Sequence, residues 1–280
     1  MGKTLFDCTL QLARLLNTLT EGIATGGSTT TVLDTVERTE ADDQWNGGTA
    51  WITYDAGGAG AAPQGEYQFI SDFVQSTSTI TLRAALTAAV AANDRYAIAP
   101  LRYPLHLLIQ KINEALGGVI EKTDITTVAI AAEQTEYSLP TDLLELKQVW
   151  VAANDDSNDN QYHQIYDWDT QKSDTGTANK LVLTRQFDAD TVVKLVYTAY
   201  HQVLRIATDK LDDSIHINKV IYNAAVGCLL WRKAKVGDSD LSVNDLLNMY
   251  QPMAAAMNNE FAMSLPRKSA KTIHPVFNRP

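Results

Sequence analysis

The feature that most constrains the fold of this 280-residue chain is the alternation of helical and extended patterns along it. Four segments carry apolar residues at steps of three and four, which is the repeat of an amphipathic helix. Two long stretches between them are rich in β-branched and aromatic residues, which is typical of strands. This order predicts an α+β protein, with a bundle of about four helices, two β-rich insertions that are small and barrel-like or sandwich-like, and an extended C-terminal arm.

The first two helices have clear start signals. The stripe of the first runs from Leu5 to Ile23, and Thr4 with Asp7 forms a capping box in which each residue satisfies a backbone donor of the first turn. The second helix follows Pro104, which suits the first turn because proline has no N–H to leave unpaired.

The last two helices follow each other closely. The third is expected to start near Asp213 or Ser214 and to end before Gly237, and the fourth to start near Ser239 or Ser242. Pro252 lies inside the fourth helix and removes one backbone hydrogen bond, so we expect a kink or a break there.

The β-rich stretches hold the remaining elements. The predicted strands are "STTTVLDT", "TAWITYD", "EYQFISDF" and "STITL" in the first stretch, and "TTVAIA", "EYSL", "LKQVWVAAN", "YHQIYDW", "KLVLTR" and "TVVKLVYTAY" in the second. "RAALTAAVAAND" is compatible with a short helix or a loop, and "NDDSND" with a hairpin tip. In "TEYSLPTDLLELKQVWV", Tyr137 and Leu139 are expected to pack, Pro140 to end the strand and Thr141–Asp142 to turn the chain.

These patterns divide the chain into six parts. The predicted parts are a first bundle helix (1–27), an inserted β domain (28–100), a second bundle helix (101–125), a second β-rich region (126–204), two C-terminal bundle helices (205–263) and an extended basic arm (264–280).

Charge and composition limit the classes of function. The net charge of −10 opposes gripping of nucleic-acid phosphates. The last 20 residues differ, since they hold no acid and four bases. Cys8 and Cys228 lie in apolar helical patterns and are predicted to be buried thiols. With no signal peptide and no long apolar run, the chain is expected to be soluble and made in a reducing cytoplasm.

Several weak chemical motifs favour structural roles. The glycine run Gly57–Gly65 has no following lysine, so it is expected to be a loop and not a phosphate cradle. Asp156, Asn158 and Asn160 have the spacing of a calcium loop, but its glycine and glutamate are missing. The acid pairs Asp42–Asp43 and Asp212–Asp213 suit turns and caps. The five histidines, His106, His163, His201, His216 and His274, have no metal-ligand spacing. No catalytic, metal or cofactor site is predicted, and the protein is not expected to be an enzyme.

At this point the order of motifs resembles the head–tail adaptor, or connector, proteins of tailed bacteriophages, including the tail tubular protein A group. The segments that carry the resemblance are "YPLHLLIQKINEAL", "EYSLPTDLLELKQVWV" and "VVKLVYTAYHQVL", together with "ATGGSTTTVLDT" and "STITLRAAL", which resemble an inserted β domain of some longer members. The resemblance covers most of the chain in order.

The resemblance implies a structural protein of the virion neck, made in the host bacterial cytoplasm. It implies a homo-oligomeric ring, typically of twelve copies, which lies under the portal protein, contacts a tail or nozzle protein and lets DNA pass without sequence-specific binding. The arm would then dock on the portal through basic and apolar side chains: Arg267, Lys268, Lys271, Ile273, His274, Val276, Phe277 and Arg279.

Three alternatives stay open. The chain could be another virion part, such as a collar, tail-completion or decoration protein, with the 28–100 insertion as its working surface. It could be an enzyme or a carbohydrate-binding module in which Trp45, Trp51, Trp150 and Trp168 form a sugar platform, although core packing suits these residues better. The basic arm could also touch nucleic acid or have no role.

Overall fold

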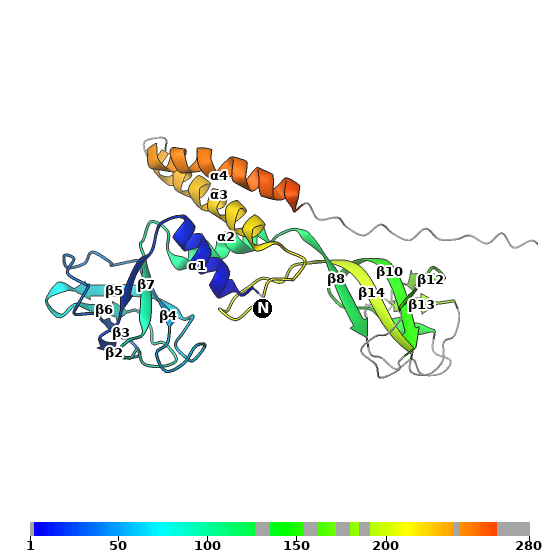
Figure 1. Ribbon diagram of the computed structural model, residues 1–280, viewed down its shortest axis with the longest axis horizontal. Helices are drawn as coiled ribbons and strands as arrows, with labels where there is room; N and C mark the ends of the chain where they lie inside the picture. The colour runs from blue at the N-terminus through cyan, green and yellow to red at the C-terminus, as the bar shows by residue number, and fades with distance from the viewer. Residues whose placement is uncertain are drawn as a thin grey trace, which may run out of the picture. The chain divides into compact units, whose positions relative to one another are not determined.

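A computed structural model describes residues 3–126, 135–153, 162–171, 180–184, 191–237 and 241–261. Four α-helices and many antiparallel strands alternate along the chain, so the α+β prediction is confirmed (Figure 1). The described residues of Met1–Gly117 and Gln202–Ala262 form one compact unit, and those of Gly118–His201 form a second.

Helix α1 (Leu5–Leu15) begins as the sequence predicts but ends early. The Thr4 hydroxyl accepts the Asp7 N–H at 3.2 Å, and the Asp7 carboxylate accepts the Thr4 N–H at 3.1 Å, which completes the capping box. The prediction of a helix as far as Ile23 is wrong. Asn17 has a φ of 50°, a left-handed conformation that ends the helix, and the chain then forms strand β1 (Thr20–Ile23).

Three further helices complete the first unit. They are α2 (Leu105–Ala115), α3 (Ile217–Val236) and α4 (Leu241–Glu260). Helix α3 packs against all of the other three, and its buried row includes Val220, Ala224 and Cys228. Pro252 lies inside α4 without breaking it. The Tyr250 hydroxyl donates to the Leu15 carbonyl at 2.8 Å, which ties α4 to the end of α1.

A seven-stranded antiparallel sheet lies between α1 and α2 in the sequence. Its order is β1-β7-β4-β5-β6-β3-β2. The other six strands are β2 (Gly26–Gly27), β3 (Thr31–Leu33), β4 (Thr49–Tyr54), β5 (Tyr67–Val74), β6 (Thr79–Leu82) and β7 (Arg95–Ala99), with a short 3₁₀ turn η1 (Gln75–Thr77) after β5. The described strands form no closed barrel, because no ladder joins β1 to β2. "RAALTAAVAAND" forms no helix.

The sheet has a core of buried, mainly apolar side chains. Its members are Ala24, Val32, Ala50, Ile52, Ile70, Phe73, Ile80, Leu82, Leu86, Val90, Tyr96 and Ile98. Leu86 and Val90 come from the segment between β6 and β7, so this loop covers the sheet and buries apolar side chains without regular structure.

The second unit contains two smaller sheets. The first has the order β11-β10-β14-β8, and the second β12-β13-β9. The bounds are β8 (Val119–Thr126), β9 (Glu136–Ser138), β10 (Leu143–Ala153), β11 (His163–Ile165), β12 (Trp168–Gln171), β13 (Lys180–Leu183) and β14 (Thr191–Tyr200). Val149 pairs with Leu195 and Val151 with Val193, and all four side chains enter one core.

The segment around Pro140 has the predicted form. Tyr137 and Leu139 are buried, β9 ends at Ser138, and Thr141 with Asp142 turns the chain into β10. Strand β8 was not predicted, because its sequence was assigned to the end of a helix and a loop. The predicted strand "TTVAIA" after Thr126, the hairpin tip "NDDSND" and the arm 264–280 lie outside the described residues.

Candidate functional site

No catalytic constellation forms among the described residues. These contain no group of three or more histidine, cysteine or acidic side chains that could hold a metal ion. The Gly57–Gly65 run links β4 to β5 and is followed by a strand, not by the helix that a phosphate loop requires. Asp156, Asn158 and Asn160 lie outside the described residues.

The acid pairs act within turns, as the sequence indicates. The Asp42 carboxylate accepts the Gln75 N–H at 2.6 Å, and that of Asp43 accepts the Asn46 side-chain amide at 2.6 Å. The Asp212 carboxylate accepts the Ser214 N–H at 3.0 Å before α3. The Asp43 and Asp212 bonds hold local structure, whereas the Asp42 bond joins two segments 33 residues apart.

Histidines and cysteines also have packing roles. His106 packs beside Phe69, and His216 stacks on Phe261 with ring centroids 3.8 Å apart. Cys8 and Cys228 are buried free thiols, which confirms the prediction. Burial raises the pKa of each thiol to about 12, so neither is a reactive thiolate near neutral pH.

The tryptophans do not form a sugar platform. Trp51 and Trp168 are buried, and Trp45 packs against the core of the seven-stranded sheet. Trp150 is partly buried and donates its indole N–H to Gln148 at 3.1 Å. Two of the four rings are therefore buried and the other two are partly buried, which does not favour the carbohydrate-binding alternative.

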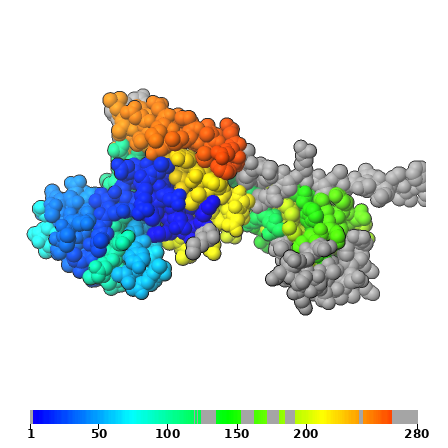
Figure 2. Space-filling model, in the orientation of Figure 1, coloured from blue at the N-terminus to red at the C-terminus, as the bar shows by residue number. Residues whose placement is uncertain are grey.

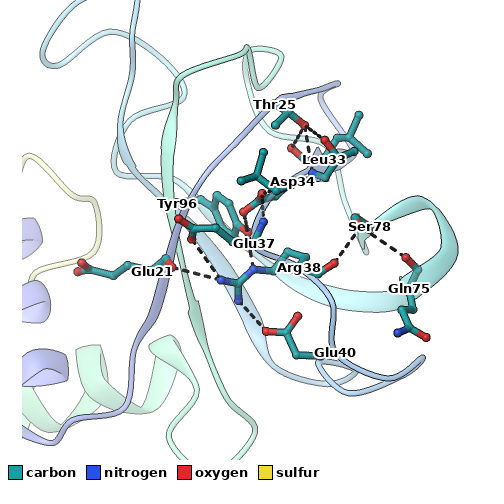
Figure 3. A network of polar contacts seen from close by, with 12 residues as sticks. Glu21, Thr25, Leu33, Asp34, Glu37, Arg38, Glu40, Gln75, Ser78 and Tyr96 are labelled. Carbon is teal, nitrogen blue, oxygen red and sulfur yellow. Dashed lines mark hydrogen bonds and ion pairs between the residues drawn. The ribbon is translucent and has the colours of Figure 1, made fainter.

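A buried ionic network is the most specific polar arrangement in the first unit (Figure 3). Asp34 and Tyr96 are fully buried and Arg38 is 4 % exposed. The Tyr96 hydroxyl donates to Asp34 Oδ2 at 2.7 Å, and Arg38 Nε lies 3.7 Å from the same oxygen. Burial and the hydrogen bond to Asp34 both raise the pKa of Tyr96, so the phenol stays protonated.

The guanidinium of Arg38 joins this pair to the surface. It donates to Glu40 at 3.1 Å and to the Glu21 carbonyl at 3.4 Å, and it lies 3.5 Å from Glu37. One cation is therefore shared among carboxylates at different depths. The network connects the end of β3 with the edge strand β1 and its neighbour β7, which no local sequence motif would connect.

Gly22 is the point where the backbone passes closest to this network. A Cβ atom there would lie 2.7 Å from the Tyr96 hydroxyl oxygen and 2.9 Å from an Asp34 carboxylate oxygen. Both neighbours are buried, so they have no room to move away. A glycine is required here by close approach.

An open groove of about 430 Å³ lies beside the network. It is lined by residues of α1, β1, β4 and β7 and by Glu37. Arg14 and Glu21 form an exposed ion pair at 2.9 Å across it, and the Arg95 guanidinium lies 5.7 Å from the Tyr54 ring centroid. The lining holds no nucleophile–base pair, so the groove offers charged and aromatic contacts and no evident chemistry.

Sequence reasoning missed this network and groove. The Asp34–Arg38 spacing of four residues was the available signal, but it does not reveal Tyr96, which lies 62 residues from Asp34. The residues predicted to dock on a portal, Arg267, Lys268, Lys271, Ile273, His274, Val276, Phe277 and Arg279, all lie outside the described residues.

A comparison with models of protein families shows the family to which the chain belongs. The model of the family described as SU10 adaptor protein matches residues 79–272, which is more than half of the chain. The chain belongs to this phage head–tail adaptor family. Among curated proteins no match was found.

Membership of the adaptor family confirms the resemblance noted in the sequence. Adaptors of this kind are structural proteins of the virion and are not known as enzymes, and membership implies contacts with phage portal and tail proteins. No described helix combines the length and the hydropathy needed to span a bilayer. The matched region starts at β6, so α1 and β1–β5 lie outside it.

Proposed function

We propose that this adaptor forms a ring of about twelve copies beneath the portal, in the neck of the virion, where it links the capsid to the tail and forms part of the DNA channel. The family match over residues 79–272 is the observation that carries this proposal. Head-to-tail association between identical chains gives a closed ring with one repeated contact when the rotation between neighbours closes.

The negative net charge of the chain is compatible with a protein that surrounds a DNA channel. Each subunit carries −10, and a ring of such subunits would surround the channel with negative charge. That potential repels the DNA backbone and opposes tight binding during passage.

We also propose which parts of the chain build the ring and which part binds the portal. Helices α1 to α4, which lie within the predicted parts 1–27, 101–125 and 205–263, would form the bundle that builds the ring. The parts 28–100 and 126–204 would be β-rich insertions, joined by β1, β2 and β8 from the ends of the helical parts. The arm 264–280 would dock on the portal. Its apolar residues Ile273, Val276 and Phe277 would fill pockets, and its four bases would pair with portal carboxylates.

Removal of residues 266–280 tests the arm. The shortened chain should keep its fold, because every described element ends by Phe261, and its affinity for isolated portal rings should fall by about a hundredfold or more as avidity is lost. Hydrogen exchange checks the fold and surface plasmon resonance the affinity. An unchanged affinity would refute the arm's role.

A collar, tail-completion or decoration protein is the second candidate. One observation favours it: α1 and β1–β5 lie outside the family match, so the segment that contains the groove could serve a partner of its own. A variant in which a short linker replaces residues 20–99, the whole seven-stranded sheet, separates the two functions. Retained binding to portal rings supports the adaptor, and lost binding supports the second candidate.

A further inference from the structure

The loop Gln202–Lys210, which precedes α3, is held in place although it contains no helix or strand. The side-chain oxygen of Asn113, on α2, accepts the Leu204 N–H at 2.8 Å, and its side-chain amide donates to the Leu204 carbonyl at 3.0 Å. The Asp209 carboxylate accepts the next two N–H groups of the loop, at 2.6 Å and 3.0 Å. These side chains fix the backbone of the loop from both ends.

The loop is also bonded to the rest of the first unit. The Leu5 N–H, at the start of α1, donates to the Asp209 carbonyl at 2.7 Å. The Phe6 N–H donates to the Ala207 carbonyl at 3.1 Å. Ala207 lies so close to Gly65 that a Cβ atom added there would be 2.7 Å from the Ala207 Cβ. The loop is therefore a rigid part of the unit.

This rigid loop presents apolar side chains to solvent. Val203 is 64 % exposed and Ile206 is 62 % exposed. Arg205 lies between them in the sequence, and the side chains of Arg205 and Lys210 are exposed as well. A loop that is already ordered loses little conformational entropy when it binds, so its exposed apolar side chains suit a contact surface.

A second exposed surface runs along α4. The buried residues of this helix, among them Leu247 and Tyr250, attach it to the first unit. Another side of the helix carries exposed residues at steps of four, four, three and four. We call these residues the outer stripe: Asp245, Met249, Met253, Ala256 and Glu260. Met249 is 50 % exposed and Met253 is 37 % exposed.

The outer stripe combines apolar groups with acceptors of hydrogen bonds. Its two acids, Asp245 and Glu260, lie at its ends, and α4 contains no lysine or arginine. Pro252 lies beside Met253 and has no N–H, so the Asn248 carbonyl lacks the helical donor that it would otherwise have. The stripe therefore suits a partner with apolar and basic side chains.

We propose that in the ring the loop Gln202–Lys210 of one copy packs on the outer stripe of the next copy. Val203 and Ile206 would contact the two methionines, and the bases of the loop would lie beside the acids of the helix. This rests on the proposed function, in which copies form a ring, and it adds the two surfaces that meet.

The two surfaces are complementary in charge and in flexibility. The loop has two exposed bases, and its one acid, Asp209, accepts two backbone N–H groups of the loop itself. Helix α4 has two acids and no base. Because each copy carries −10, contact between copies is favoured where a basic surface meets an acidic one. Methionine side chains are flexible and adapt to a rigid partner.

The loop and the outer stripe lie on different sides of the first unit. The loop is bonded to the start of α1 and to α2, whereas α4 packs along α3. Figure 1 shows the loop, in yellow, below α3 and beside the start of α1. Figure 2 shows α4 at the outside of the first unit, above α3. A contact between two different surfaces repeats from copy to copy, which is the arrangement that a ring requires.

Cross-linking between single cysteines tests this contact. The full chain with Ile206→Cys and Met249→Cys is assembled on portal rings, treated with a short bismaleimide and separated on a denaturing gel. The double variant should give a ladder of covalent oligomers. An equal mixture of the two single variants should give dimers and nothing larger, and each single variant alone should stay monomeric. The native thiols do not interfere, since Cys8 and Cys228 are buried.

A matched control moves one cysteine off the loop. Leu101→Cys replaces Ile206→Cys, because Leu101 is 67 % exposed in the same unit but lies outside the loop and α4. Together with Met249→Cys it should give no ladder. A ladder of equal yield in this control would mean that cross-linking reports crowding on the portal and would overturn the assignment.

The outcomes separate this contact from the ring itself. Copies that assemble on the portal without a ladder, or with dimers alone from the double variant, would overturn the contact and leave the ring proposal intact. If no copies assembled on the portal, the ring proposal would fail. Cross-linking of the concentrated free chain would then decide the contact, with a ladder in its favour and monomers against it.

Reversal of charge tests the ionic part of the contact. Arg205→Glu in the cross-linking variant should lower the yield of the ladder at least about tenfold, because an acid then faces the acids of α4. Adding Asp245→Arg and Glu260→Arg to the same chain should restore the yield. Arg83→Glu, which reverses an exposed base elsewhere in the first unit, is the control and should have no effect. A loss that the second reversal does not restore would overturn the proposed pairing of charges.

Discussion

The seven-stranded sheet of the first unit and the sheets of the second unit place their charges differently. Asp34, Arg38, Asp55 and Asp94 are buried in the first. In the described part of the second, the ion pairs Lys122–Asp142 and Lys180–Glu136 lie at the surface, and the core cluster is apolar apart from the hydroxyl of Tyr137 and Tyr197 and the indole N–H of Trp168.

The difference follows from how the backbone N–H groups of each sheet find hydrogen-bond acceptors. Strands β10 and β14 pair over most of their length, so their ladder supplies its own hydrogen bonds. The first sheet has shorter strands and longer loops that pack inside, and side-chain carboxylates accept their N–H groups. Asp94, for example, accepts from Ala56 at 2.8 Å and from Ala91 at 2.7 Å. In the first sheet, buried acidic side chains therefore accept the N–H groups of loops that have no strand partner.

The largest effect is expected from Arg38→Ala. Removing the guanidinium takes away the cation beside the fully buried Asp34 side chain, and breaking a buried ion pair from one side should lower the free energy of unfolding of the first unit by about 3–5 kcal/mol. Arg14→Ala is the matched control: Arg14 pairs with Glu21 in the same unit, but both side chains are more than half exposed, so its loss should cost less than about 1 kcal/mol. Hydrogen exchange resolved by segment measures both. Equal losses would mean that burial does not govern these pairs.

An intermediate effect is expected from Gly22→Ala. The added methyl group would press on Tyr96 and Asp34, and overpacking of this kind costs about 1–3 kcal/mol. Gly26→Ala is the control, because its Cβ would meet only a Leu33 methyl group at 4.0 Å. Chemical denaturation followed by circular dichroism compares the two, and a similar stability for both variants would contradict the steric account.

The smallest effect is expected from Asp142→Asn in the second unit. The Lys122 ammonium 2.6 Å away lowers the pKa of Asp142, and the Tyr197 hydroxyl also donates to it. Both partners are partly exposed, so the loss at neutral pH should be at most about 1 kcal/mol. Because the folded pKa is depressed, the contribution is present above the ordinary carboxyl pKa and disappears as the pH falls through the folded value. Urea titrations across that range should show wild type and variant converging in acid. A constant gap would argue against the ion pair.

Local patterns predicted much of this fold. The apolar stripe after Pro104 predicted α2, although the predicted helical part ran on to 125 and included most of β8. The turn at Thr141–Asp142 follows from the inability of Pro140 to continue a ladder. The failure at Thr20–Ile23 has a long-range cause: these residues follow the helical stripe but pair with β7, more than 70 positions away. Periodicity cannot reveal a partner so distant.

The candidate surfaces were less predictable for the same reason. The groove takes its lining from α1 and from three strands that meet only in the folded unit. Likewise, the exposure of Met249 depends on which side of α4 faces α3. Apolar residues with helical spacing lie on the buried side of α4, at Val243, Leu247 and Tyr250, and also on its exposed side, at Met249 and Met253. The sequence alone therefore does not show which side is buried.

The pairing of β1 with β7 affects which insertions and deletions in the sequence this fold can tolerate. Thr20 lies opposite Ile98, so the chain enters and leaves the seven-stranded sheet through neighbouring strands. Helices α1 and α2, which flank the sheet in sequence, also contact each other. A segment whose two ends meet behaves as a cassette: it can be lengthened, trimmed or exchanged through a short bridge while the flanking helices keep their contact.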